Sequence, residues 1–137
     1  CILYHNNSQR ITTTSSGITV TGTGTATDWI ATSDRKLKRN IEPLEDSLDK
    51  VLKLQGKSFT RIDVEDKTKK HIGLIAQEVE EIVPELVSEA RLTDDDDKYV
   101  DTVKAVKYEK ITALLIEAIK EQQIQIEELK AKVNKNT

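Results

Sequence analysis

The sequence predicts an α+β protein in which the tip of a fibrous β-stem precedes a small mixed α/β globular part and a long C-terminal coiled-coil helix. Two changes of composition support this prediction. Residues 1–32 are rich in Thr, Ser and Gly, and residues 18–27 within them alternate with a period of two, whereas residues 103–133 contain no Gly or Pro and carry a heptad pattern. The stretch between them mixes short apolar runs with charged turns, which is typical of small α+β domains.

The first part, residues 1–33, is predicted to be the end of a fibre stem. Its stretch ITVTGTGTAT, residues 18–27, alternates regularly, and Thr and Val favour strands. Apolar residues are so sparse that strands from one chain bury too little surface to offset the entropy lost on ordering. We therefore expect several copies to wrap around one another. A flexible Ser/Thr linker is the alternative interpretation.

Composition limits the classes of function. The 137 residues are long enough for one modest core, but with 36% hydrophobic and 33% charged residues we expect either long exposed helices or a core that is shared between chains. A net charge of -3 with interspersed bases and acids argues against nucleic-acid or membrane partners. Cys1 is the lone cysteine, so neither an internal disulfide nor a cysteine-bound zinc site is predicted. No other metal and no cofactor is predicted. The absence of Met leads us to expect a C-terminal piece of a longer chain.

The second part, residues 34–104, is predicted to form the globular part. Pro43 suits the first position of a helix, and Pro84 requires a later helix to end at or before it. The acidic stretch TDDDDK lacks the glycine bend and distal Glu of a calcium loop, so we expect a solvated turn. The predicted order is helix 43–54, strand 57–64, turn 65–70, strand 71–76, helix 77–83, strand 85–90 and acidic loop 93–98.

The third part, residues 105–137, is predicted to be a coiled-coil helix that begins near Val103. If Thr112 occupies an a position, the a and d positions form an apolar seam interrupted by one glutamine. Ile111 and Ile116 flank this seam and are expected to pack on the globular part. β-Branched a residues with Leu at d favour two strands, so the heptad alone does not indicate three. The predicted seam consists of Leu115, Ile119, Gln122, Ile126, Leu129 and Val133.

The boundary SDRKLKRNI, residues 33–41, carries the candidate chemistry. A serine hydroxyl needs a base to become a nucleophile, and a neutral lysine can serve. A free lysine has a pKa near 10.4, so a catalytic lysine needs desolvation or nearby positive charge, and three other bases surround Lys38. Lys38 follows Ser33 by five residues, so a turn at residues 34–36, or a lysine from a neighbouring chain, is required. The ordinary alternative is a helix cap followed by a solvated basic turn.

Three segments in order resemble a known family: SDRKLKRNIEPL, GLIAQEVEEIVPELV and VKYEKITALLIEAIKEQQIQIEELKAKV. They are similar to the intramolecular chaperone, self-cleaving domain at the C-terminal ends of phage tailspikes and tail fibres, including endosialidases. The resemblance covers residues 33–133. It implies a homotrimer and a catalytic dyad of Ser33 and Lys38. It also implies a single-turnover serine endopeptidase that cuts between Ser33 and Asp34.

The resemblance also implies a function. A domain that trimerises first would hold the upstream stem strands of the same polypeptide in register, at about millimolar effective concentration, and then release itself. The precursor of the tail fibre or tailspike would be made in the host cytoplasm, and the released domain would be absent from the mature virion fibre. An uncleaved trimerisation tip and a receptor-binding tip are the alternatives.

The sequence is compatible with several routes of attack. Attack by Ser33 on its own carbonyl passes through a strained four-membered ring. Attack on the Thr32 carbonyl forms a five-membered ring but cuts before the serine. A serine of a neighbouring chain, or water activated by Lys38, avoids both difficulties.

Other residues are weaker candidates. His71 is predicted either to support the site or to be a partly buried structural histidine. Gln77 and Glu78 are expected either to hydrogen-bond across subunits or to lie on an exposed helical face. The basic run after Ser33 has no glycine-rich phosphate loop beside it, so nucleotide binding is not predicted.

Overall fold

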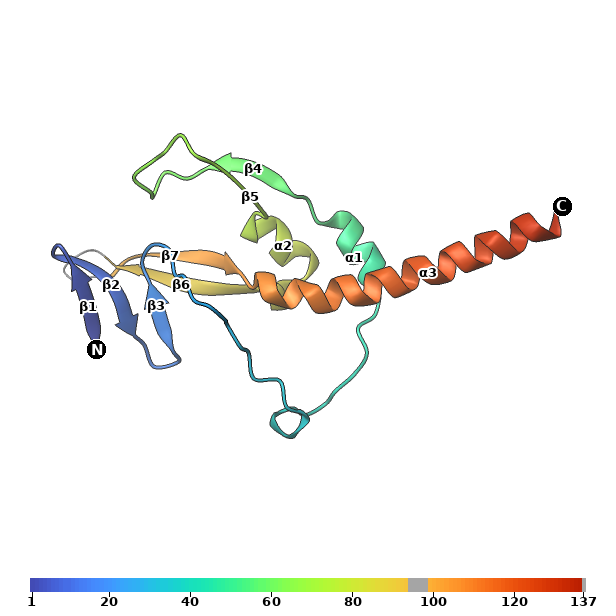
Figure 1. Ribbon diagram of the computed structural model, residues 1–137, viewed down its shortest axis with the longest axis horizontal. Coiled ribbons are helices and arrows are strands. Elements are labelled where there is room, and N and C mark those ends of the chain that lie inside the picture. Colours follow the sequence, from blue (N-terminus) through green and yellow to red (C-terminus); the bar gives the residue numbers. More distant parts are fainter. Residues whose placement is uncertain (94–98, 137) are drawn as a thin grey trace. The chain divides into compact units, whose positions relative to one another are not determined.

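A computed structural model describes residues 1–93 and 99–136 and confirms the mixed α+β class (Figure 1). The chain forms two compact units. Unit 1 comprises Cys1–Ile41 and Arg91–Val103, and unit 2 comprises Glu42–Ala90 and Lys104–Thr137. Residues 94–98, which make up most of the predicted acidic loop, lie outside the described residues.

Unit 1 contains a three-stranded antiparallel sheet. Its strands β1 (Ile2–His5), β2 (Ser8–Thr13) and β3 (Ile18–Val20) follow one another in space as they do in the chain. Asn6 and Asn7 both have positive φ, as a tight two-residue hairpin requires. Gln9 is the buried polar residue of this sheet, whose apolar side chains are mostly exposed.

The predicted alternating stretch is only partly a strand. β3 ends at Val20, and the chain from residue 21 to residue 34 contains no strand. Every side chain of this stretch is exposed. The composition explains this exposure, because threonine and glycine give a single chain too little apolar surface to bury. A stem built from several chains stays a prediction.

Unit 2 is assembled around a small apolar core. Val79, Leu86 and Leu114 are buried and in contact, and residues from both ends of the unit pack around them. The predicted helix stop is confirmed, because α2 ends before Pro84. The further elements of the chain are α1 (Ser47–Lys53), β4 (Lys57–Thr60), β5 (Lys70–Gly73), α2 (Ala76–Ile82), β6 (Val87–Thr93), β7 (Tyr99–Val106) and α3 (Ile111–Lys135).

Several predicted elements differ in their bounds from the structure. The strands predicted at residues 57–64, 71–76 and 85–90 are Lys57–Thr60, Lys70–Gly73 and Val87–Thr93. α1 begins at Ser47 rather than at Pro43, and α3 begins at Ile111 rather than near Val103. Residues 99–106 instead form β7, which pairs with β6. This segment is rich in Val, Thr and Tyr, which favour a strand once a partner strand is available. Pairing with β6 therefore outweighs the helix propensity of residues 103–106, and α3 starts only at Ile111.

The hydroxyl of Tyr108 joins β5 to the start of α3. The amide of Leu74 donates a hydrogen bond to it at 2.8 Å. Gly73 leaves room for this approach, because a Cβ atom there would lie 2.6 Å from the Tyr108 hydroxyl oxygen and would displace it. The contact therefore holds the end of the β4–β5 hairpin against the segment that leads into α3.

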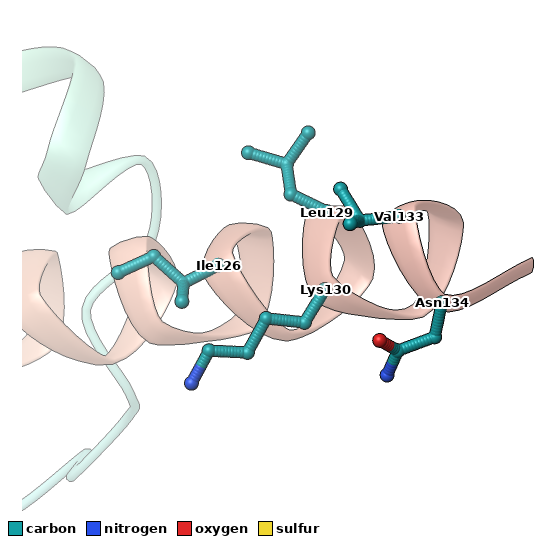
Figure 2. A pocket seen from close by; sticks show the side chains of 5 residues that line it. All are labelled: Ile126, Leu129, Lys130, Val133 and Asn134. Carbon is teal, nitrogen blue, oxygen red and sulfur yellow. The ribbon is translucent and has the colours of Figure 1, made fainter. Parts of the chain in front are cut away.

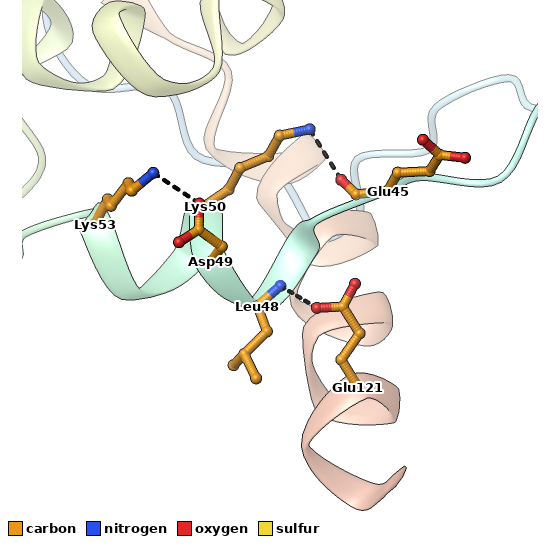
Figure 3. Close-up of polar contacts among 6 residues, drawn as sticks. All are labelled: Glu45, Leu48, Asp49, Lys50, Lys53 and Glu121. Carbon is orange, nitrogen blue, oxygen red and sulfur yellow. Dashed lines mark hydrogen bonds and ion pairs between the residues drawn. The ribbon is translucent and has the colours of Figure 1, made fainter. Parts of the chain in front are cut away.

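The N-terminus of α1 is capped by a residue of α3. Asp46 precedes the helix in the left-handed region, with φ 53°, and its side chain makes no capping hydrogen bond. The carboxylate of Glu121 instead accepts a hydrogen bond from the amide of Ser47 at 3.1 Å. It accepts a second one from the amide of Leu48 at 2.6 Å, which Figure 3 shows. A carboxylate at this position satisfies free amides and complements the helix dipole. Glu121 thus ties α1 to the long helix.

We expect Glu121→Ala to destabilise unit 2 by about 1–3 kcal/mol, because the partly buried amides of Ser47 and Leu48 lose their charged hydrogen-bond acceptor. Glu121→Gln should cost less, since its amide oxygen still accepts one bond. Denaturant unfolding of the full chain measures the loss, and hydrogen exchange should localise it to the amides of Ser47 and Leu48. Glu128→Ala is the control, because Glu128 is exposed on the same helix. Equal effects of Glu121→Ala and Glu128→Ala would rule out the cap as a stabilising contact.

Candidate functional site

The candidate site is the boundary segment from Ser33 to Lys38 in unit 1. Arg35–Leu37 forms one turn of 3-10 helix. The amide of Leu37 donates to the carbonyl of Asp34 at 3.1 Å, and the amide of Lys38 donates to the carbonyl of Arg35 at 3.0 Å. A turn at this place is what the five-residue spacing of Ser33 and Lys38 requires if their side chains are to meet within one chain.

The turn brings the side chains of Ser33 and Lys38 together within one chain. Lys38 Nζ donates a hydrogen bond to Ser33 Oγ at 2.6 Å. This distance suits proton transfer between the two groups. Both residues are exposed in the single chain. The pair thus has the contact that a serine–lysine dyad needs, and its catalytic role stays a prediction.

Asp34 organises the turn from its first position. Its carboxylate oxygen Oδ1 accepts a hydrogen bond from the amide of Lys36 at 2.9 Å, and its backbone is extended, as is typical of a helix N-cap. Lys36 Nζ also lies 3.8 Å from Asp34 Oδ2, but both side chains are largely exposed, so this ion pair contributes little. The sequence predicts a capped turn and a serine–lysine pair as alternatives, whereas the structure contains both arrangements.

The three weaker candidates lie in unit 2. The ring of His71 stacks on that of Phe59, with 6.1 Å between ring centroids. His71 Nε2 is buried without a hydrogen-bond partner among the described residues. Glu78 forms an ion pair with Lys57 at 3.3 Å, and Gln77 is exposed. A supporting role for His71, Gln77 or Glu78 stays a prediction.

The predicted coiled-coil seam is an exposed stripe on α3. Exposed fractions are 63% for Ile119, 45% for Ile126 and 60% for Leu129. Figure 2 shows the end of this stripe, where Ile126, Leu129 and Val133 line a shallow hollow together with Lys130 and Asn134. A single helix provides no opposite wall for this hollow. Of the described residues of the chain, none covers these side chains enough to bury them.

The inner face of α3 lies beside the seam. Leu114 and Ala118 are buried, and Ile111 packs against the core as predicted. The prediction for Ile116 is wrong, because this side chain is 51% exposed. In Figure 1 the C-terminal part of α3 extends beyond its contact with α1. The first turns of α3 therefore belong to the core, whereas the later turns present the seam.

Within residues 1–93 and 99–136, no three His, Cys, Asp or Glu side chains come together as a metal site would require. In that same part of the chain, no helix has the length and apolar character needed to cross a bilayer.

Comparison with known proteins points to one family. The chaperone of endosialidase family (Peptidase_S74) matches residues 33–88. The long tail fiber protein Gp37 of Enterobacteria phage Ox2 is 34% identical over 113 residues, which cover 80% of this chain and 43% of that protein. Gp37 of Enterobacteria phage K3 is 31% identical over 103 residues, or 74% of this chain and 8% of that protein. Gp37 of Salmonella phage S16 is 35% identical over 109 residues, or 75% and 14%. The chain spans less than half the length of each of these relatives.

Proposed function

Residues 33–88 are a chaperone of endosialidase domain in a chain homologous to phage long tail fibre proteins, and on this premise we propose that the chain folds a fibre stem and then cuts itself free. The observation that carries the proposal is the hydrogen bond between Lys38 and Ser33. Ser33 is also the first residue of the family match. The contact therefore lies at the boundary between the family domain and the segment before it.

Assembly is the first step of the proposal. The stripe that contains Ile119, Ile126 and Leu129 needs partners, because exposed apolar area of this extent favours association. We propose that three copies bury it in a coiled coil. Residues 34–104 would form the globular chaperone part and residues 105–137 the coiled coil, while residues 1–33 end the stem. Stem strands of high contact order fold slowly, so a trimer that forms first sets their register.

Cleavage is the second step. A neutral Lys38 takes the proton of Ser33 Oγ, or that of a water molecule, and the resulting nucleophile attacks the carbonyl of the scissile bond. The proton then passes to the leaving amine, so the Ser33–Asp34 bond breaks and Asp34 gains a free amino group. If water is the nucleophile, this step also leaves a carboxyl group on Ser33. If a serine is the nucleophile, it forms an ester with the Ser33 carbonyl, and a water molecule then hydrolyses that ester to the carboxyl group and the free serine. Because attack by Ser33 on its own carbonyl is strained, a serine of a neighbouring chain or a water molecule is the proposed nucleophile for this bond. Neighbouring chains would also enclose the exposed pair.

We expect the stem to need this domain for folding but not for persistence. Deleting residues 34–137 from a stem-bearing gene should give aggregated fibre, whereas mature fibre should keep its heat resistance after the domain has left, because it is kinetically trapped. Light scattering and thermal melting of both preparations measure these outcomes. Soluble, heat-resistant fibre from the truncated gene would refute the chaperone role.

A second candidate function has support from one observation. The exposed seam on α3 is explained equally well by a trimerisation tip that is never cut. Denaturing electrophoresis of freshly made, stem-bearing protein separates the two functions, because only the self-cleaving chaperone yields two fragments.

A further inference from the structure

We infer that Asp34 is a positioning residue for the cleavage, since its carboxylate stabilises the turn that carries Lys38 to Ser33. This inference rests on the proposed function. Asp34 contributes to the turn twice. Its side chain accepts from the amide of Lys36 at 2.9 Å, and its carbonyl accepts from the amide of Leu37 at 3.1 Å.

The turn is necessary for the contact between serine and lysine. In an extended chain, residues five apart are separated by about 16 Å, which is longer than a lysine side chain. In the structure Lys38 Nζ lies 2.6 Å from Ser33 Oγ. Any change that opens the turn therefore separates the two groups without altering either of them.

The turn depends on its cap. It contains three residues and is closed by two backbone hydrogen bonds, and its side chains are exposed, so no packing supports it. Short 3-10 turns have poor hydrogen-bond geometry and little stability alone. The Asp34 carboxylate adds a third bond to a backbone amide in the first turn, where capping side chains act most strongly.

The acceptor oxygen matters here rather than the negative charge. The ion pair of Asp34 with Lys36 is long, at 3.8 Å, and solvated. Asparagine keeps an oxygen at the same distance from the backbone, whereas alanine removes it. The two substitutions therefore separate the cap from the charge.

The test uses the stem-bearing precursor and measures the first-order rate of cleavage. We expect Asp34→Asn to cut within about twofold of the native rate, and Asp34→Ala to cut about fivefold to tenfold more slowly, as loss of a cap predicts. The rate of Asp34→Ala should keep the native dependence on pH, because Lys38 is intact. Asp28→Ala is the matched control, since Asp28 is exposed in the same unit and lies before the site.

A second measurement detects the turn itself. In precursor that carries Ser33→Ala to prevent cutting, hydrogen exchange at the amides of Lys36 and Leu37 should be faster with Asp34→Ala but not with Asp34→Asn. Sedimentation should show that assembly is unchanged. If Asp34→Ala is cut as fast as the native chain, or if both amides exchange at the native rate, the positioning role is overturned. If the native precursor is never cut, the proposed function fails and the positioning role fails with it.

Discussion

Ser33→Ala is expected to abolish cleavage of the stem-bearing chain while leaving its assembly intact. The hydroxyl that Lys38 contacts is lost, and a self-cleaving enzyme without its nucleophile or the group that positions its nucleophile slows by about a thousandfold or more. Ser33 is exposed, so the substitution removes little packing. Denaturing electrophoresis should show one uncut band, and sedimentation should show the native oligomer. If Ser33→Ala is cut as fast as the native chain, Ser33 and Lys38 do not act as a catalytic dyad.

The same experiment extends to the base. Lys38→Ala should also block cleavage, and Lys38→Arg should not rescue it, because a guanidinium stays protonated above pH 12. The native rate should rise with pH, since only the neutral amine accepts a proton. It should be independent of protein concentration once oligomers exist. Mass spectrometry should find Asp34 at the N-terminus of the released piece, whereas Ser33 there would indicate attack on the Thr32 carbonyl.

Ile119→Asp and Ile126→Asp are expected to weaken assembly by several kcal/mol per trimer. Each copy would place an unpaired carboxylate in an apolar seam, which costs far more than the lost apolar contact. Sedimentation equilibrium of the full chain should show a trimer for the native protein at micromolar concentration and a monomer for either variant. A native monomer under these conditions would contradict the proposed assembly.

α3 provides a matched control for this prediction. Ile124 is 57% exposed on the same helix but lies outside the predicted seam. Ile124→Asp introduces the same charge only two residues from Ile126 along the helix. Because Ile124 lies outside the seam, this substitution should leave the trimer intact. If Ile124→Asp disrupts assembly as strongly as Ile126→Asp, the contact face has been assigned to the wrong side of the helix.

The elements that the sequence predicts best are those whose stability is local. A run without Gly or Pro forms α3, Pro84 ends α2, and residues 57–60 and 70–73 form strands on either side of a charged turn. Each of these features follows from propensities and breakers within a few residues. The heptad face of α3 is likewise exposed as a stripe, although its partners stay a proposal.

Elements that depend on distant residues were missed or misplaced. The predicted C-terminal helix begins near Val103, but residues 103–106 belong to strand β7, because β6 is available to pair with it. α1 begins at Ser47 because a carboxylate from residue 121 caps it, and no local pattern around Pro43 signals that contact. Glu121 itself occupies a position that a heptad assigns to solvent. A cap supplied from far along the chain leaves no periodic signal.

By itself, the sequence determined the mixed α+β class and the long C-terminal helix, and it predicts a boundary at Ser33, the residue at which the family match begins. The spacing of Ser33 and Lys38 also shows that their side chains can meet within one chain only if a turn lies between them. Only the tertiary structure decided that Asp34 caps such a turn and that Lys38 Nζ lies 2.6 Å from Ser33 Oγ. The physical reason is that propensity and periodicity describe the backbone over several residues, whereas a contact between two side chains depends on the direction in which one short turn points them.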